Sequence, residues 1–293
     1  MDEGRYHRQE LFFGKEGQER LAKCAVAIVG LGGLGSHVVQ QLAYLGVGSF
    51  FLVDHDTVTH SNLNRVIGAT EADVGCRKVE VASRVIGAVL PGTQVETACD
   101  TFIKEEVFRR LQAVNFVFGC VDNDASRLVL NEFCQAYSLS YIDIATGMNP
   151  EDNRFGGRIL FSDGRACLVC KDLLDDAQIR DAVASARERQ EEERIYGVRR
   201  RALGEVGPAV VSLNGIMAAV AVTEFMVEVT GVRRAQVHLE YKGEMGILVR
   251  DETPPDFDCY YCKRQRGKES AADVERYIRE GWGRRLMARN TTR

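Results

Sequence analysis

A glycine-rich turn constrains the fold of this chain more than any other feature of its sequence. The pattern Gly30-x-Gly32-x-x-Gly35, which also holds Gly33, follows an apolar run, and a second apolar run ends in Asp54. Glycines allow a tight turn, the helix that follows attracts phosphate, and an acid after the second strand hydrogen-bonds ribose hydroxyls. The pattern predicts an adenosine-nucleotide site. If the glycines served only to let strand and helix pack closely, the rest of the pattern would be unexplained.

Short apolar runs and amphipathic stretches alternate through the first half of the chain. The former predict strands and the latter predict helices. Repeated βαβ units form a mostly parallel sheet with helices on both faces, so we predict a Rossmann-like, doubly wound α/β fold. The predicted strands are 24–29, 49–54, 93–98, 114–119 and 140–145, and the predicted helices are 33–45, 77–90, 104–111 and 124–137, the last capped by Asp124.

The alternation ends after Thr146, where a C-terminal extension begins. Apolar runs at 156–164, 236–241 and 246–250 predict a mixed or antiparallel sheet region. A charge run at 175–201 predicts a solvated helix and a mobile loop, and a polar helix is expected at 271–282 before a frayed basic tail. We divide the single domain into an N-terminal helical arm (1–22), the nucleotide-binding core (23–165), the extension (166–262), and a C-terminal helix with its tail (263–293).

Charge and composition exclude several classes of function. A formal net charge of -4 gives no global electrostatic reason to bind nucleic acid or an anionic membrane. The uncharged run 206–223 reaches the lower length limit for a membrane span, but its glycines, proline and polar residues favour a buried core or dimer helix. The first residues lack the pattern of a secretory signal and the nine cysteines are odd in number, so we expect reduced thiols and a cytoplasmic location.

The segment that follows the second strand distinguishes an ATP site from an NAD site. It reads DHDTVTHSNLNR from Asp54 to Arg65, and DVGCRK follows at 73–78. Together with RYHRQ at 5–9 and CVDN at 120–123, these motifs resemble the ThiF/MoeB/HesA family of the ubiquitin-activating superfamily. The resemblance implies one adenylation domain that uses ATP to activate a carboxyl-terminal carboxylate. Its partner would be a ubiquitin-like or sulfur-carrier protein ending in Gly-Gly, or a short peptide.

The polar residues of these motifs suit adenylation, in which a carboxylate attacks the α-phosphorus and negative charge gathers on the departing pyrophosphate. Arg65 and Lys78 supply fixed cations for that charge, and Asn62 supplies a hydrogen bond to phosphate. Asp122 offers a hard oxygen ligand for Mg²⁺. Taken singly, each residue has an ordinary alternative as a surface cation or a helix cap, but their joint spacing favours the functional role.

The resemblance adds three further assignments. It implies that Asp54 holds the ribose and that Asp56 assists the metal. It also implies that Arg8 reaches the γ-phosphate from the partner subunit of a homodimer. Dimerisation would then be part of catalysis.

Four of the cysteines form two CxxC pairs, Cys167-x-x-Cys170 and Cys259-x-x-Cys262, with 88 residues between them. Two such knuckles complete a tetrahedral Cys₄ zinc site, which would be structural because no position stays open for water. A redox dithiol is the competing interpretation, and the presence of two pairs favours zinc. The family resemblance supports the same site.

The chain lacks a cysteine between Lys171 and Asp258, where many members of the family carry one that accepts the activated acyl group. Cys120 and Cys134 are expected to pack as small apolar residues. We therefore hypothesise that the acyl adenylate forms without a thioester on this chain. Cys76 is the first candidate if a thioester does form.

Two other classes of function stay open. An NAD-dependent oxidoreductase shares the glycine turn, but it does not explain Arg65, Lys78 and Asp122, or the paired cysteines. A non-catalytic scaffold would act as the half-site partner of an active subunit. The presence of Arg8 and Asn62 beside the other charged residues argues against it.

Overall fold

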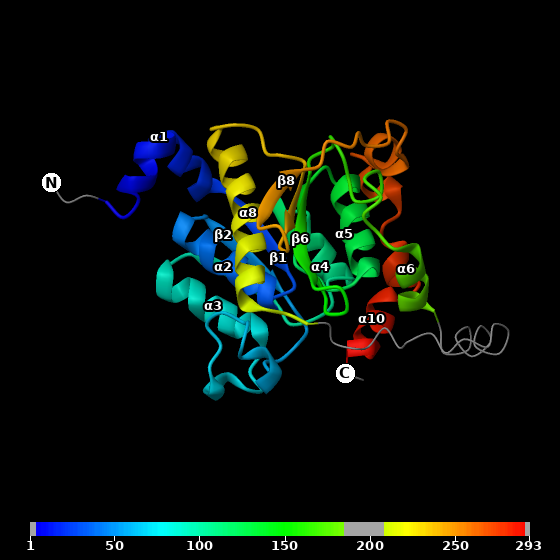
Figure 1. The fold of residues 1–293 in the computed structure, drawn as a ribbon, viewed down its shortest axis with the longest axis horizontal. Helices are drawn as coiled ribbons and strands as arrows, with labels where there is room; N and C mark the ends of the chain where they lie inside the picture. Colours follow the sequence, from blue (N-terminus) through cyan, green and yellow to red (C-terminus); the bar gives the residue numbers. More distant parts are fainter. Residues whose placement is uncertain (1–3, 185–207, 291–293) are drawn as a thin grey trace.

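Within residues 4–184 and 208–290, which the computed structural model describes, one eight-stranded sheet runs through the molecule (Figure 1). Its order is β3-β2-β1-β4-β5-β6-β7-β8; the first five of these are parallel, and β6, β7 and β8 continue the sheet antiparallel. This order confirms the Rossmann-like prediction, and the strands of the extension join the same sheet. The strands are β1 (Ala25–Val29), β2 (Ser49–Val53), β3 (Gln94–Ala98), β4 (Phe116–Gly119), β5 (Ser140–Asn149), β6 (Arg154–Ser162), β7 (His238–Lys242) and β8 (Ile247–Arg250).

Alternate residues of the parallel strands point to opposite faces of the sheet, and each face has its own core. Val26 and Ile28 of β1 pack with α2, α3 and α8, whereas Ala27 and Val29 pack with α4, α5 and α10. Because both faces are buried, these strands are apolar throughout. The helices are α1 (His7–Lys23), α2 (Gly33–Leu45), α3 (Lys78–Val89), α4 (Glu105–Leu111), α5 (Asp124–Ala136), α6 (Asp176–Val183), α8 (Val211–Thr230), α9 (Arg276–Arg279) and α10 (Trp282–Asn290).

Helix α8 corresponds to the uncharged run at 206–223, of which residues 206 and 207 lie outside the described residues. Among the described residues it is the one helix long and apolar enough to cross a membrane, and 56% of its most apolar window is buried inside the molecule. Met217, Ala221 and Phe225 pack into the core on one face of the sheet. Gly231, in the left-handed conformation, ends the helix. This packing is that of the predicted core helix.

The predicted cap of α5 is wrong by one residue. Asn123 precedes the helix, and its Oδ1 accepts a hydrogen bond from the Ser126 amide at 2.8 Å. Asp124 is instead the first helical residue, and its carboxylate pairs with Arg127 at 2.7 Å. Asn123 has the extended backbone of an N-cap residue, with φ of -139° and ψ of 148°, and its side chain can cap a helix as well as that of aspartate.

The predicted polar helix at 271–282 is also wrong. Asp273 and Gly281 adopt left-handed backbone, with φ of 54° and 74°, which confines the helical turn between them to α9. Helix α10 then begins at Trp282, where a frayed tail was expected, and its Leu286 packs into the core beside α5. In the segment 175–201, predicted as a solvated helix followed by a mobile loop, α6 covers Asp176–Val183, and positions 185–201, which hold the charge run, lie outside the described residues.

Candidate active site

The glycine turn joins β1 to α2 at the carboxyl ends of the parallel strands, beside the point where the strand order reverses between β1 and β4. Gly30 has a φ of 91°, and a Cβ on it would lie 2.6 Å from the Cys120 carbonyl oxygen. A Cβ on Gly35 would lie 1.9 Å from the Gly30 carbonyl oxygen. A Cβ on Gly32 would meet nothing within 4 Å. The turn is therefore packed on its inner side and open at Gly32, in the crevice where doubly wound sheets bind ligands.

Asp54 fastens this turn to the end of β2. Its Oδ2 accepts from the Leu31 amide at 2.6 Å, and its Oδ1 accepts from the Asp56 amide at 2.8 Å. Burial raises the pKa of Asp54, and the nearby Lys78 ammonium acts in the opposite direction. Lys78, buried at the start of α3, donates to Asp56 Oδ2 at 2.7 Å. The acid predicted to hold the ribose and one predicted cation thus belong to one cluster, with Asp56 between them.

The loop after β2 brings a second predicted cation to the turn. Asn62 is buried in this loop, and its Oδ1 accepts from the Thr59 amide at 3.3 Å, which closes a short 3-10 turn. Arg65 follows and donates to the Ser61 carbonyl. A Cβ on Gly33 would lie 3.4 Å from Arg65 Cδ, so the arginine side chain passes over the first residue of α2. Its guanidinium bonds within the loop, since Nη1 also donates to Asn64 Oδ1 at 3.1 Å.

Asp122 lies exposed in the loop after β4, and this loop also borders the turn. The backbone of Cys120 and Val121 is what a Cβ on Gly30 would meet. Arg127 holds the loop from α5, since its Nη2 donates to the Val121 carbonyl at 2.8 Å. The structure therefore brings Asp122, Asp54, Asp56, Asn62, Arg65 and Lys78 to the loops around the glycine turn.

A buried ion network behind this loop is absent from the sequence-based predictions. Asp143 of β5 is fully buried and accepts from Tyr141 Oη at 2.9 Å and from Arg158 Nη1 at 3.0 Å. Arg127 Nε lies 3.5 Å from the same carboxylate. Two guanidinium groups compensate the buried charge, as a buried carboxylate requires. Asp143 is the only charged residue in the strand sequence SYIDIA, and that isolated acid is the signal that could have revealed the network.

Arg8 is not brought to this site. It is exposed on α1, and two residues close to it in the sequence show where this part of α1 lies. Gln9 donates to the Tyr44 carbonyl at 3.2 Å, and a Cβ on Gly46 would meet the Tyr6 side chain. Both contacts lie at the C-terminal end of α2, whose 13 residues span about 20 Å. The glycine turn lies at the other end of that helix, so Arg8 cannot reach the turn of its own chain.

A groove of about 560 Å³ lies beside this crevice, over the ends of β5, β6 and β7. Glycines lie along it, and charged and aromatic side chains from β6 and β7 border it. A smaller hollow of about 400 Å³ lies between α1, α2 and α8. The residues that line the groove include Thr146, Gly147, Arg154, Phe155, Gly156, Gly157, Tyr241, Lys242 and Glu244.

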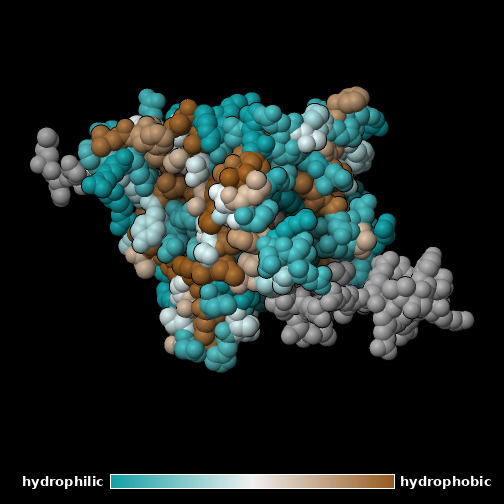
Figure 2. Space-filling model, in the orientation of Figure 1, coloured by the Kyte–Doolittle hydropathy of each residue, from teal (hydrophilic) through white to brown (hydrophobic). Residues whose placement is uncertain are grey.

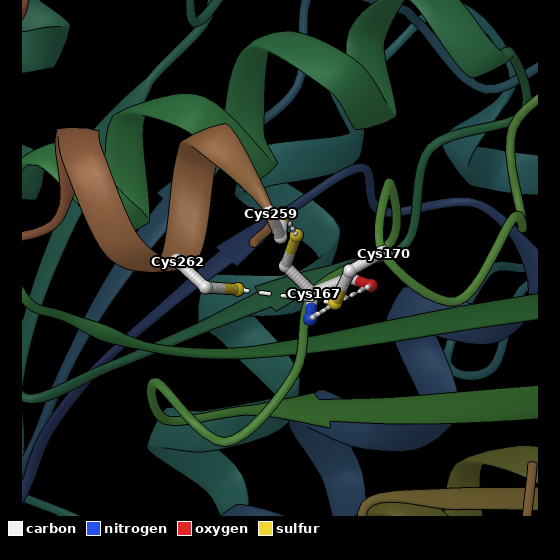
Figure 3. A group of neighbouring side chains, drawn as sticks. All are labelled: Cys167, Cys170, Cys259 and Cys262. Carbon is white, nitrogen blue, oxygen red and sulfur yellow. Dashed lines mark hydrogen bonds between the residues drawn. The ribbon is translucent and has the colours of Figure 1, made fainter. Parts of the chain in front are cut away.

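The four paired cysteines converge where the segment after β6 meets the turn before α9 (Figure 3). Cys167 Sγ lies 3.7 Å from Cys259 Sγ, and Cys170 Sγ lies 3.9 Å from Cys262 Sγ. A tetrahedron with Zn–S bonds of about 2.3 Å has edges of about 3.8 Å, whereas a disulfide brings two sulfurs to about 2.05 Å. These two sulfur–sulfur distances match the edges of such a tetrahedron and are too long for disulfides.

The other cysteines on the interior elements pack as predicted. Cys120 and Cys134 are buried in the two cores, and burial raises the pKa of each thiol. Neither has the thiolate character that a nucleophile needs. Cys76 is half-buried in the loop before α3, where its carbonyl accepts from the Val58 amide at 2.8 Å.

Comparison with known proteins agrees with this geometry. The ThiF family model matches residues 6–251. The chain belongs to the ThiF family. The molybdopterin-synthase adenylyltransferase of Escherichia coli is 35% identical over 171 residues, which are 57% of this chain and 66% of the relative. The sulfur carrier protein adenylyltransferase of Thermus thermophilus is 38% identical over 130 residues, which are 44% of this chain and 48% of the relative.

Other matches of this ThiF-family chain are partial in length or distant in sequence. Ubiquitin-like modifier-activating enzyme 5 of Drosophila virilis is 33% identical over 166 residues, so the chain spans 40% of that relative's length. The crystal structure of Escherichia coli MccB with MccA-N7isoASN has a TM-score of 0.71 at 18% identity, covering 88% of this chain and 75% of that one. At that identity, the likeness shows a shared fold.

Proposed function

We propose that this ThiF-family chain adenylates a carboxylate. A carboxylate oxygen attacks the α-phosphorus of ATP, the bond to pyrophosphate breaks, and acyl-AMP and pyrophosphate are the products. The observation that carries the proposal is the convergence of Arg65 and Lys78 on the glycine turn, beside Asp122. Hydride transfer to a nicotinamide does not require two such cations. The names of the relatives, several of them adenylyltransferases, support the same activity.

Each group around the turn has a place in this reaction. The N-terminus of α2 and the Arg65 guanidinium would meet the charge that grows on the departing phosphates. Lys78 would exchange Asp56 for a phosphate oxygen, and Asn62 would donate its amide hydrogens. Asp54 keeps free lone pairs for ribose hydroxyls even though both its oxygens accept backbone hydrogen bonds. The carboxylate nucleophile is already ionised near neutral pH, so the site needs no general base.

Two metals belong to the proposal, with different roles. Asp122 would hold Mg²⁺, which supplies charge neutralisation at the phosphate oxygens. The four clustered thiolates would hold structural Zn²⁺, which ties the segment after β6 to the C-terminal turns. Reduced thiolates of this kind suit the cytoplasm, which we propose as the compartment.

We propose that the groove over β5, β6 and β7 receives the carboxyl-terminal tail of the partner. Gly147 lines the groove and opens on free space. Gly156 and Gly157 instead let the strands of its floor pack closely, because a Cβ on them would lie 2.1 Å from the Tyr241 carbonyl oxygen and 2.6 Å from the Ala145 carbonyl oxygen. Arg154 and Lys242 lie at the groove, where they can meet acidic side chains. A ubiquitin-like or sulfur-carrier protein ending in Gly-Gly fits this description, and a short peptide is the alternative. The names of the relatives favour the carrier protein.

The proposal also requires a homodimer. Figure 2 shows apolar side chains gathered on the face formed by α1, α2 and α8, where Leu11, Phe12 and Tyr44 are 74%, 64% and 60% exposed. Ile216 of α8 is also exposed. Patches of this kind mark protein interfaces. Arg8 cannot reach the glycine turn of its own chain. If a second copy packs on this face, Arg8 of the partner subunit would enter that site instead.

Exchange of labelled pyrophosphate into ATP tests the activity. The assay uses a panel of carriers that end in Gly-Gly and of short peptides. We expect exchange that falls by roughly 10²- to 10³-fold in Arg65→Ala and in Asp122→Ala, because each loses a charge at the transition state. Arg109→Ala removes an equally basic but exposed side chain from α4 and serves as the matched control.

Three results would count against the proposal. Near-normal exchange by folded Arg65→Ala would refute the role assigned to the Arg65 cation. Failure of every carrier and peptide would favour the scaffold. NADH turnover by the purified protein would restore the oxidoreductase.

A further inference from the structure

Asn214 is a buried polar residue near the start of α8. It lies in the first turn of the helix and is 3% exposed, and its buried neighbours Leu213, Met217 and Ala218 are apolar. Burying an amide is unfavourable unless it finds partners, and leucine, of similar size, has the higher helix propensity. The presence of a carboxamide here therefore has to be explained by what it contacts.

The Asn214 side chain contacts both halves of the candidate site. Its Oδ1 accepts a hydrogen bond from Thr146 Oγ1 at 3.3 Å, and Thr146 is a residue of β5 that lines the groove. Its Nδ2 lies against the glycine turn, because a Cβ on Gly33 would be only 2.2 Å from that nitrogen. The same Cβ position is 3.4 Å from Arg65 Cδ. One carboxamide thus bridges the start of α2 and the wall of the groove.

We propose that Asn214 is a positioning residue that couples the nucleotide turn to the acyl groove. Attack on the α-phosphorus requires the carboxylate and ATP to meet at a fixed distance and angle, and small displacements slow such reactions strongly. The phosphates bind at the start of α2 and the tail lies along β5, so the register between these two elements sets that geometry. Asn214 fixes the register by contacting Gly33 on one side and Thr146 on the other.

The inference rests on the proposed function for the identity of the two ligands, but the coupling can be tested with ATP alone. Hydrogen exchange is measured with and without saturating ATP. In the wild-type chain we expect ATP to protect the amides of the turn at 30–36 and also those around the groove at 145–149 and 154–158. In Asn214→Ala we expect unchanged protection at the turn and unchanged ATP affinity, together with loss of the protection around the groove.

Three further variants separate coupling from stability. Thr146→Val removes the same hydrogen bond from the other side and is expected to uncouple the groove in the same way. Thr146→Ser keeps the hydroxyl and is expected to restore the coupling. Thr230→Val is the matched control, since Thr230 is equally buried on α8 and donates to the Met226 carbonyl at 2.7 Å, at the end of the helix far from the turn. It is expected to keep the coupling whatever its effect on stability.

The possible outcomes distinguish this inference from the proposed function. Groove protection that persists in Asn214→Ala and Thr146→Val overturns the inference. A wild-type chain in which ATP protects the turn but not the groove also overturns it, and leaves adenylation standing. A wild-type chain in which ATP protects neither region contradicts the proposed function itself, and the coupling with it.

Discussion

Two glycines of the turn, Gly35 and Gly32, are expected to respond differently to the same added methyl group. In Gly35→Ala the new Cβ would lie 1.9 Å from the Gly30 carbonyl oxygen, whereas real Cβ contacts essentially never fall below 3.0 Å. Turn and helix would have to separate by about 1 Å, and the obstacle is backbone, which does not rotate away. Gly30 is itself fixed by its hydrogen bond to Val53 at 2.9 Å, so relaxation is limited.

The magnitude follows from that contact. Overpacking against rigid surroundings costs about 1–3 kcal/mol, and we expect Gly35→Ala at the upper end. For a chain of this size, such a loss lowers the Tm by about 5 °C. Gly32→Ala should leave the Tm unchanged, because its φ of -73° suits alanine and its Cβ would meet nothing within 4 Å. In the proposed function the phosphates approach through that free space, so ATP affinity should fall at least about tenfold, a loss of about 1.4 kcal/mol.

Thermal unfolding by circular dichroism and ATP binding by calorimetry measure the two effects separately. Gly87→Ala is the control, because Gly87 lies in α3 with open space around it and an alanine there should stabilise the helix slightly. Normal ATP affinity in Gly32→Ala would refute the assignment of the turn to phosphate binding. An unchanged Tm in Gly35→Ala would refute the packing argument for the turn.

Two further predictions concern the dimer and the metal. Arg8→Ala and Asp122→Ala should each be inactive alone, but mixing equal amounts should restore about a quarter of the activity, because half of the symmetric dimers then hold one intact site. Recovery of no activity, with mixed dimers demonstrated by mass spectrometry, would place Arg8 outside the partner's site. Zinc should copurify with the protein. Its removal by a chelator, or the substitution Cys259→Ser, should lower the Tm, while ATP still binds at temperatures below the lowered Tm. Zinc-free protein of undiminished Tm would contradict the structural role.

Most of the nucleotide-binding core could be predicted from the sequence, because its signals are local. Strands buried on both faces must be apolar throughout, and the bounds of α2 follow from the glycines that flank it, Gly32 and Gly46. The C-terminal turns were missed for the opposite reason. The left-handed backbone that interrupts them occurs at Asp273 as well as at Gly281, and an aspartate rarely signals it.

Residues of the candidate site could be predicted only where they belong to a motif whose spacing is typical of the family. Motif spacing identified Arg65, Lys78 and Asp122, and the structure gathers them around the turn. The contact between Gly33 and Asn214 joins residues 181 positions apart, and it depends on how α8 lies against α2. No local pattern encodes such a contact. The position of Arg8 at the far end of α2 likewise depends on how α1 packs.

Intact-mass spectrometry of the carboxylate partner tests the central claim most directly. A carrier protein ending in Gly-Gly is incubated with the enzyme, ATP, Mg²⁺ and pyrophosphatase, beside the same carrier with an amidated C-terminus. The account predicts the mass of one adenylyl group on the free-acid carrier, nothing on the amidated one, and no covalent adduct on the enzyme. Adenylation of the amidated carrier, or an acyl group attached to an enzyme cysteine, would contradict it.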